Sequence, residues 1–332
     1  MSYVYAVARL KAMENRFLDA SFFSRLIDSA TLEEALKSLG ETVYGQWISG
    51  SAPAEFDQVI DRELIASCED LERFVPDREL LDIYRMPHDF NNVKVILKSL
   101  FRAREGGERR YDLLSALGAV DTERLIMALE GEEYGLLPYG LADVIPHCWT
   151  LWEQTKNTKD IDLMLDGAMF AAMRKTAEAL GIPEVVRWVE RRIDAENLGN
   201  AARLARMNTD PAAALPFFHN GGTIRPADAA KLLGEPLESW GKALSHTDLG
   251  AVFEGIQDRS DMQATLCDIS KALSDSLIRV LEKAKYSASA PGNVILYLLQ
   301  KEEEARSLRI ALVCVANGLN REFARRLLSH AR

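Results

Sequence analysis

The sequence has little cysteine and no cysteine pair at a metal-binding spacing. Its four cysteines stand far apart and no CxxC motif occurs; they are Cys68, Cys148, Cys267 and Cys314. A structural zinc site needs four converging ligands, usually supplied as two close pairs. We therefore expect reduced thiols, mostly buried, and no metal site.

Long hydrophobic runs and an excess of positive charge are also absent. The longest clean apolar run, Ile310 to Ala316, is far shorter than the ~18 residues of a membrane helix. The 332 residues carry a formal net charge of −10, whereas an extended nucleic-acid surface needs a basic excess. We expect a cytoplasmic chain with no direct membrane insertion and no nucleic-acid partner. With 48% hydrophobic residues, it can build two or three domain-sized cores.

Common catalytic and nucleotide-binding motifs are missing as well. The sequence contains no GxxxxGK[ST], GxGxxG, HExxH, GxSxG or DDxxD motif, and its five histidines are scattered, so we expect them at the surface or at helix caps. Asp160, Asp162 and Asp166 lie close together, but apolar residues stand where a calcium loop needs oxygen ligands and a glycine. We interpret Asp160 and Asp162 as residues of a first helical turn. We predict no catalytic residue and no cofactor. A helical metal-dependent enzyme that uses these aspartates is kept as an alternative, the third after the two that are given at the end of this subsection.

Apolar residues recur at helical spacing almost throughout, and alternating β-branched runs are lacking, which predicts an all-α fold. In TLEEALKSLGET, Thr31 is placed to cap a helix with Glu34 as its capping-box partner, and Gly40 is placed to end it. A second copy of this signal occurs in VDTERLIMALEGEEYG, which begins at Val120, and a looser third copy in RPADAAKLLGEPLESWG, which begins at Arg225. Helical hairpins of one type therefore repeat along the chain.

A polar pattern repeats with the hairpins. Asp89-x-x-Asn92 precedes Lys98 by six residues, counted from the asparagine, and Asp194-x-x-Asn197 precedes Arg203 in the same way. A third, degenerate version places Glu303 six residues before Arg309. The copies are 105 and 106 residues apart, which indicates three related helical bundles. Loop-rich segments around 105–107 and 208–222 suggest lobes at 1–107, 108–215 and 216–332.

The first copy, HDFNNVKVILKSLFRAR, suggests roles for its polar residues. Asp89 is placed to cap a helix, and Asn92 borders an apolar stripe, where its amide needs hydrogen-bond partners. We interpret both, together with Asp194 and Asn197 of the second copy, as structural residues. Lys94, Lys98 and Arg102 form a row of like charges, which needs either water or an acidic partner.

Seven segments in order carry a family resemblance. They are YVYAVARLKAME, SLGETVYG, YxxxHDFNNVKVILK, IDLMLD, IDAENLGNAARL, FFHNGGTI and YLLQKEEEARSLRIALV, and they span essentially the whole chain. Together they resemble the C subunit of V-type/A-type ATPases and ATP synthases, which is equivalent to the d subunit of eukaryotic vacuolar pumps. The chain departs from the family pattern in GNAA, residues 199–202, and the third copy lacks the asparagine.

The resemblance implies three similar helical lobes around a pseudo-threefold axis in a funnel-shaped molecule that catalyses nothing itself. It implies two partners in a complex for ion transport or ATP synthesis, the central-stalk subunits and the cytoplasmic face of the proteolipid rotor ring. The chain would then be peripherally associated with the membrane. The alternative from another class is a cytoplasmic helical adaptor unrelated to a rotary motor. We predict that residues of the basic row, of the two other copies of the pattern and of the first segment bind partners. They are Arg9, Lys94, Lys98, Arg102, Arg203, Glu303 and Arg309.

Overall fold

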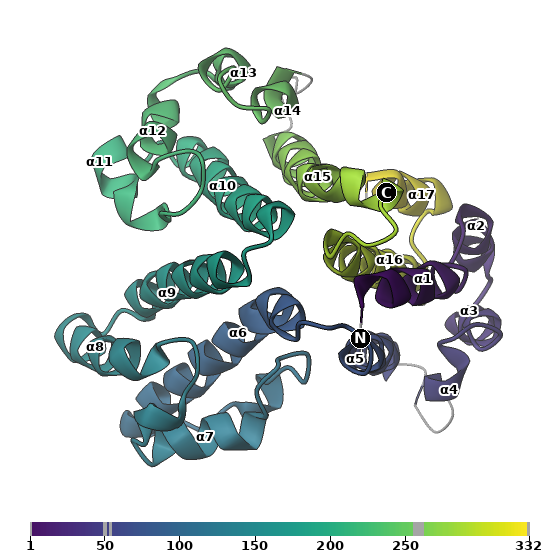
Figure 1. The fold of residues 1–332 in the computed structure, drawn as a ribbon, viewed down its shortest axis with the longest axis horizontal. Helices are drawn as coiled ribbons and strands as arrows, with labels where there is room; N and C mark the ends of the chain where they lie inside the picture. Colours follow the sequence, from purple (N-terminus) through teal and green to yellow (C-terminus); the bar gives the residue numbers. More distant parts are fainter. Residues whose placement is uncertain (1, 49–51, 53–54, 255–261, 331–332) are drawn as a thin grey trace. The chain divides into compact units, whose positions relative to one another are not determined.

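A computed structural model describes residues 2–48, 52, 55–254 and 262–330. All regular structure within these ranges is helical, with no strand, which confirms the all-α prediction (Figure 1). The chain forms two compact units. We name them the N–C unit, built from Met1–Leu81 with Leu281–Arg332, and the middle unit, Asp82–Val280. The division into three lobes stays a prediction.

The N–C unit joins the two ends of the chain. Its elements are α1 (Tyr3–Glu14), α2 (Ala20–Asp28), α3 (Leu32–Leu39), α4 (Gly45–Ile48), α5 (Phe56–Glu72), η7 (Glu282–Tyr286), α16 (Gly292–Ala316) and α17 (Arg321–His330). The long helix α16 contacts α1, α2, α3, α5 and α17, and Figure 1 shows it among these helices. Its side chains are therefore buried on nearly every face, including those of Lys301 and Glu304.

The middle unit follows the chain in order. Its elements are most of α6 (Glu79–Arg104), then η2 (Tyr111–Leu113), α7 (Thr122–Glu130), η3 (Tyr134–Leu136), α8 (Leu141–Thr155), α9 (Thr158–Leu180), α10 (Pro183–Arg206), α11 (Pro211–Ala214), η4 (Leu215–Phe217), α12 (Pro226–Lys231), η5 (Leu232–Gly234), η6 (Leu237–Ser239), α13 (Trp240–Ala243), α14 (Gly250–Glu254) and most of α15 (Met262–Leu281). Helix α9 packs between α8 and α10, and α10 packs on α12 and η5. Trp240 and Phe253 belong to the core that covers the second half of α10.

Several local predictions are confirmed. The Thr31 hydroxyl accepts a hydrogen bond from the backbone N–H of Glu34 at 3.2 Å, and α3 ends at its C-cap, Gly40. Asp121 likewise caps α7 by accepting the N–H of Arg124 at 2.9 Å. The four cysteines are free thiols, three of them buried. For α3 and α7, sequence rules that act within one helical turn therefore give the right helix starts.

Three predictions are wrong. Asp160 lies in the first turn of α9, as predicted, but Asp162 comes after that turn, because the helix begins at Thr158.

Asp89 does not cap a helix, because α6 begins ten residues earlier at Glu79 and runs through Pro87. The residues before Pro87 are largely buried, and this packing outweighs the backbone hydrogen bond that proline removes. His219 is not at the surface: it is buried, with its ring centroid 4.8 Å from that of Phe170. Burial lowers the pKa of His219, so the imidazole is held neutral.

Candidate functional site

The Asp-x-x-Asn pair of α6 holds the loop that follows the helix. Asn92 makes two hydrogen bonds to the backbone of Ser115: its Oδ1 accepts the N–H and its Nδ2 donates to the C=O, both at 2.8 Å. The Asp89 carboxylate accepts the N–H of Val120 at 3.0 Å and the hydroxyl of Tyr139 at 3.3 Å. Both side chains are buried, so the loop's backbone groups are satisfied without water.

The second copy repeats this geometry on α10. Asn197 accepts the N–H of His219 at 2.8 Å and donates to its C=O at 2.9 Å. Asp194 accepts the N–H of Thr223 at 3.0 Å, its hydroxyl at 2.6 Å, and the N–H of Ile224 at 2.9 Å. We call each set of residues a loop anchor: Asp89 and Asn92 with residues 115–120, and Asp194 and Asn197 with residues 219–224.

Each loop anchor also contains a glycine and an arginine. A Cβ built on Gly118 would overlap the Asp89 carboxylate, and one on Gly222 would overlap the Asp194 carboxylate. Arg85 donates to the C=O of Gly118, and Arg174 donates to the C=O of Gly221 at 2.7 Å. The loops approach their helices so closely that only glycine fits beside each carboxylate.

Burial of the anchoring carboxylates changes their protonation. It raises the pKa of Asp89 to about 6, against the opposing effect of the N–H groups that it accepts. Burial raises the pKa of Asp194 in the same way, opposed by the hydrogen bonds from Thr223 and Ile224. The ionised form is therefore disfavoured at both anchors.

The raised pKa of Asp89 predicts a pH-dependent stability. Because the folded-state pKa lies above the unfolded value, its contribution is fully present below about pH 4 and is lost as the pH rises through about 6. We expect the free energy of unfolding of the wild type to rise by roughly 1 kcal/mol more than that of Asp89→Asn between pH 7 and pH 5. Asparagine can still accept the Val120 N–H. Urea unfolding at both pH values measures the difference, and equal pH slopes would contradict the prediction.

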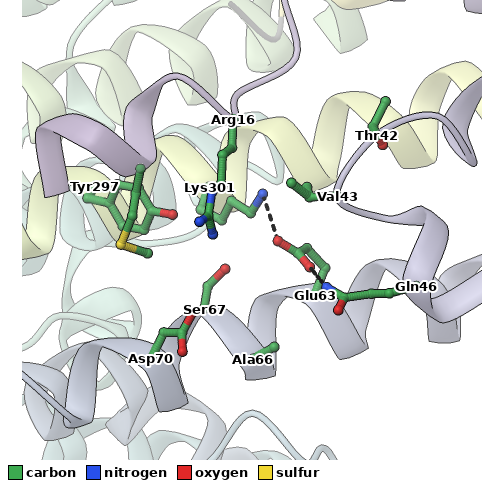
Figure 2. A pocket seen from close by; sticks show the side chains of 11 residues that line it. Arg16, Thr42, Val43, Gln46, Glu63, Ala66, Ser67, Asp70, Tyr297 and Lys301 are labelled. Atoms are coloured by element: carbon green, nitrogen blue, oxygen red, sulfur yellow. Dashed lines mark hydrogen bonds and ion pairs between the residues drawn. The ribbon is translucent and has the colours of Figure 1, made fainter. Parts of the chain in front are cut away.

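The N–C unit contains a polar cavity of about 340 Å³ beside α16 (Figure 2). It is lined by Met13, Arg16, Thr42, Val43, Gln46, Glu63, Ala66, Ser67, Asp70, Tyr297 and Lys301. Arg16 and Lys301 extend toward the space from the same side, and Ser67 and Asp70 come from α5. Such a lining can hydrogen-bond water, a small polar molecule or a partner's side chain.

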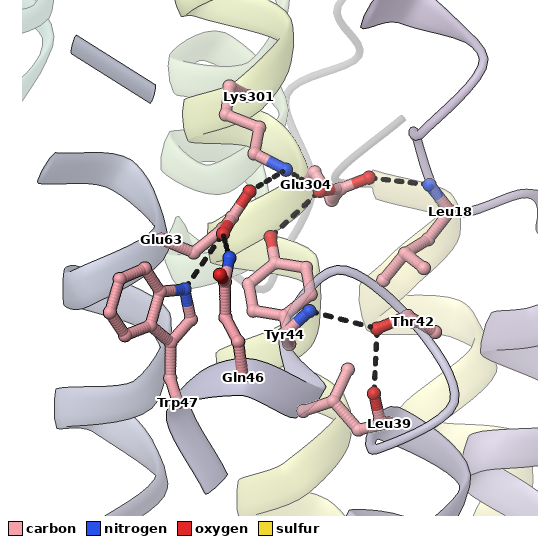
Figure 3. A network of polar contacts seen from close by, with 9 residues as sticks. All are labelled: Leu18, Leu39, Thr42, Tyr44, Gln46, Trp47, Glu63, Lys301 and Glu304. Carbon is pink, nitrogen blue, oxygen red and sulfur yellow. Dashed lines mark hydrogen bonds and ion pairs between the residues drawn. The ribbon is translucent and has the colours of Figure 1, made fainter. Parts of the chain in front are cut away.

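A buried ion network forms part of the wall of this cavity, to which Glu63 and Lys301 belong (Figure 3). The ammonium of Lys301 lies 2.8 Å from Glu304 Oε1 and 3.3 Å from Glu63 Oε1, and the Lys301 side chain is only 2% exposed. Glu63 also accepts the indole N–H of Trp47 at 2.8 Å, and Glu304 accepts the hydroxyl of Tyr44 at 2.7 Å. One cation thus compensates two carboxylates that also accept hydrogen bonds, as a buried ion pair requires.

Glu304 and Asp89 bind their neighbouring segments in the same way, because each carboxylate accepts a backbone N–H just before a shorter helix. Glu304 accepts the backbone N–H of Leu18 at 2.5 Å, and Asp19, the next residue, caps α2. Val120, whose N–H Asp89 accepts, likewise precedes the cap residue Asp121. Helix α16, which carries the third copy, is therefore bonded to the segment before α2 by Glu304, the residue after Glu303, which is the counterpart of Asn92 in the repeat.

Three of the four predicted partner-binding cations of the middle unit, all but Arg102, have acidic neighbours among the described residues. Lys94 pairs with Asp166 at 2.5 Å and Lys98 with Asp162 at 2.7 Å, which ties α6 to α9. Arg203 lies on the outside of α10, 3.3 Å from Glu196 and 2.6 Å from the Oδ1 of Asn200. Arg102 is exposed in the last turn of α6, where its side chain covers Gly107. The Lys98 and Arg203 side chains remain 39% and 53% exposed, so a partner can still reach them.

The predicted residues of the N–C unit have different neighbours. Arg309 pairs with Asp57 at 3.4 Å and with Asp61 on α5. Glu303 lies 3.5 Å from Arg306 on its own helix. Arg9 stacks on an aromatic ring, with its guanidinium carbon 4.5 Å from the centroid of Phe74. The network of Lys301, Glu304 and Glu63 was missed from the sequence; its one signal is the KEEE run inside an otherwise apolar helix.

The described residues offer neither a metal-binding cluster nor a membrane span. Within them, no group of three or more histidine, cysteine or acidic residues could hold a metal ion. Asp162 and Asp166, two of the clustered aspartates, are paired with lysines. None of the helices in the described ranges is long and apolar enough to cross a membrane.

Comparison with known proteins gives matches over nearly the whole chain. The model of the ATP synthase (C/AC39) subunit family matches residues 6–327. The chain is 22% identical over 313 residues to the C subunit of the V-type sodium ATPase of Enterococcus hirae, covering 94% of each chain. It is 26% identical over 320 residues to the C subunit of the V-type ATP synthase of Thermus thermophilus, covering 93% of this chain and 92% of the relative. With the C subunit of the A-type ATP synthase of a Desulfurococcus species it shares 25% identity over 348 residues, covering 98% and 90%.

Proposed function

The chain belongs to the ATP synthase (C/AC39) subunit family, and from this we propose that it is a non-catalytic subunit of the central rotor in a V/A-type rotary ATPase or ATP synthase. It links the central stalk to the membrane-embedded rotor ring, so that rotation in one drives rotation in the other. It is peripherally associated with the membrane, on the cytoplasmic side. The observation that carries this proposal is the match of one family along residues 6–327.

The packing supports a role in passing torque. A coupling protein must resist shear, and loops that slide over helices would absorb it. Here the loops after α6 and α10 are bonded to those helices by buried side chains, and Glu304 does the same for the N-terminal segment. Close-packed interiors with satisfied polar groups deform little.

The test is purification of the tagged chain from membranes in mild detergent. We expect central-stalk subunits and a proteolipid ring to co-purify with it. Deletion of the chain should abolish ion pumping, while the detached catalytic head still hydrolyses ATP. A chain that purifies without either partner, and whose deletion leaves ion pumping unchanged, would contradict the proposal and favour an unrelated helical adaptor.

Lys98 and Arg203 are proposed partner contacts, and a charge swap can test Lys98. We expect Lys98→Glu to reduce the recovery of stalk subunits and also to lose the ion pair with Asp162. The double variant Lys98→Glu/Asp162→Lys restores that pair within the chain, so its stability should recover while the recovery of stalk subunits stays low. Full recovery of both in the swapped variant would place the whole role of Lys98 inside the chain. Arg203→Glu should lower recovery with little effect on stability, because Arg203 is exposed.

A further inference from the structure

Helix α1 presents an exposed arginine whose guanidinium stacks on a buried aromatic ring. The Arg9 guanidinium lies over the ring of Phe74, 4.5 Å from its centroid, and its Nη1 donates to the hydroxyl of Tyr5 at 3.5 Å. The ring of Tyr5 stands perpendicular to that of Phe74, with centroids 6.5 Å apart. The guanidinium is thus fixed from two sides by residues of the N–C unit.

Arg9, like Arg102, lacks the carboxylate partner that the other proposed partner-binding cations have among the described residues. Lys94, Lys98, Arg203 and Arg309 each have a carboxylate within 4 Å. Arg9 is exposed and has no ion pair with any residue in the described ranges. Glu14, five residues farther along the chain, pairs with Lys11, and Asp77, three residues after Phe74, accepts the Tyr3 hydroxyl at 2.6 Å.

The surroundings of Arg9 have the composition of a protein-binding surface. Val4 and Tyr5 are 56% and 50% exposed on the same helix, which is high for large apolar side chains. Tyrosine and arginine are enriched among the residues that contribute most to protein–protein affinity. An arginine already stacked on a ring loses little freedom when it binds, so less of the binding energy is spent on ordering it.

We propose that Val4, Tyr5 and Arg9, with Arg9 supported by the buried ring of Phe74, form a docking point for an acidic side chain of a protein partner. Resting on the proposed function, that partner is a central-stalk subunit. The carboxylate takes the N–H groups of Arg9 that no described residue uses, and apolar atoms beside it cover Val4 and Tyr5. An anionic lipid surface fits less well, because lipid binding needs several clustered cations. This patch supplies one, on a chain of net charge −10.

The test measures the affinity of the purified full chain for the purified central-stalk subunits, at low and at high salt. We expect Arg9→Glu to weaken binding about tenfold or more. Arg9→Lys should weaken it less, since lysine keeps the charge but not the planar stacking. The matched control is Lys11→Glu, which makes the same charge change on the opposite face of α1 and should alter the affinity less than about twofold. Circular dichroism and urea unfolding of each variant check the fold.

The outcomes separate this inference from the proposed function. If the wild type binds the stalk and Arg9→Glu binds as Lys11→Glu does, the docking point is wrong and the rotor function stands. If Arg9 is needed instead for binding vesicles of phosphatidylglycerol, with stalk affinity unchanged, the docking point is also wrong. If the wild type binds no stalk protein at all, the rotor function falls and the docking point falls with it. Restoration of Arg9→Glu binding by one Asp→Arg or Glu→Arg change in a stalk protein would identify the contact.

Discussion

Replacing Lys301 with methionine is expected to lower the free energy of unfolding of the N–C unit by roughly 3–5 kcal/mol. Methionine fills a similar volume but removes the cation that lies between Glu63 and Glu304, whose side chains are 10% and 4% exposed. Two buried carboxylates would then face each other without compensation. Breaking a buried pair by removing one partner costs far more than the pair contributes net, because the remaining charge stays buried.

A second substitution should recover part of the stability that the Lys301→Met variant loses. Glu304→Gln removes one of the two buried negative charges, so that Glu63 no longer lies beside a like charge without a cation between them. The double variant should therefore have a higher free energy of unfolding than Lys301→Met alone.

An exposed pair of the same spacing provides the control for Lys301. Lys11 and Glu14 are also three residues apart and 2.9 Å from each other, but their side chains are 42% and 33% exposed. Lys11→Met should change the free energy of unfolding by less than about 0.5 kcal/mol. Urea unfolding followed by circular dichroism measures all variants. Equal, small effects at Lys301 and Lys11 would mean that the network around Lys301 is not the buried cluster described.

The sequence could predict what is local or repeated. The caps at Thr31 and Asp121 follow from residues within one helical turn, and the Asp-x-x-Asn pairs stand out because they recur after 105 residues. The roles of Asn92 and Asn197 followed from one consideration, that an amide at the edge of an apolar stripe must find partners. The identity of those partners, the backbones of Ser115 and His219, came only from the structure.

Contacts between residues far apart in the sequence explain why the role of Glu304 was not predicted and why the role of Asp89 was predicted wrongly. Glu304 meets Leu18 and Tyr44 across 286 and 260 residues of chain, and nothing in the KEEE run indicates which glutamate turns inward. The position of α16 among five helices decides it, since a helix covered on nearly every face must bury some of its polar residues. The error at Asp89 has a similar cause. The local signal of a proline followed by an aspartate resembles a helix start, but packing of the preceding turns extends α6 upstream.

The three anchoring carboxylates share one structural role. Asp89, Asp194 and Glu304 each accept backbone N–H groups of a segment that leads into a shorter helix. In the first two anchors the segment belongs to the residues that follow the long helix. In the third it belongs to the N-terminus, so the last long helix is completed by the first residues of the chain.

The glycine beside Asp194 should be the least replaceable residue of its loop. A Cβ on Gly222 would lie 2.9 Å from Cγ of Asp194 and would overlap its Oδ1. The carboxylate cannot move aside without breaking its bonds to Thr223 and Ile224. We expect Gly222→Ala to lower the free energy of unfolding of the middle unit by roughly 2–3 kcal/mol, through overpacking and the loss of these bonds.

Hydrogen exchange locates this effect. In Gly222→Ala, the amides of Thr223 and Ile224 should lose protection more than those of α9, because the loop is released before the helices unfold. The matched control is Gly234→Ala in η5 of the same unit, where a Cβ would meet nothing within 4 Å and the change should stay within about 0.5 kcal/mol. Under the proposed rotor function, a released loop should lower ion pumping per ATP hydrolysed for Gly222→Ala but not for Gly234→Ala. Normal protection at Ile224 in a stable Gly222→Ala protein would show that the loop does not lie as close to Asp194 as the anchor requires.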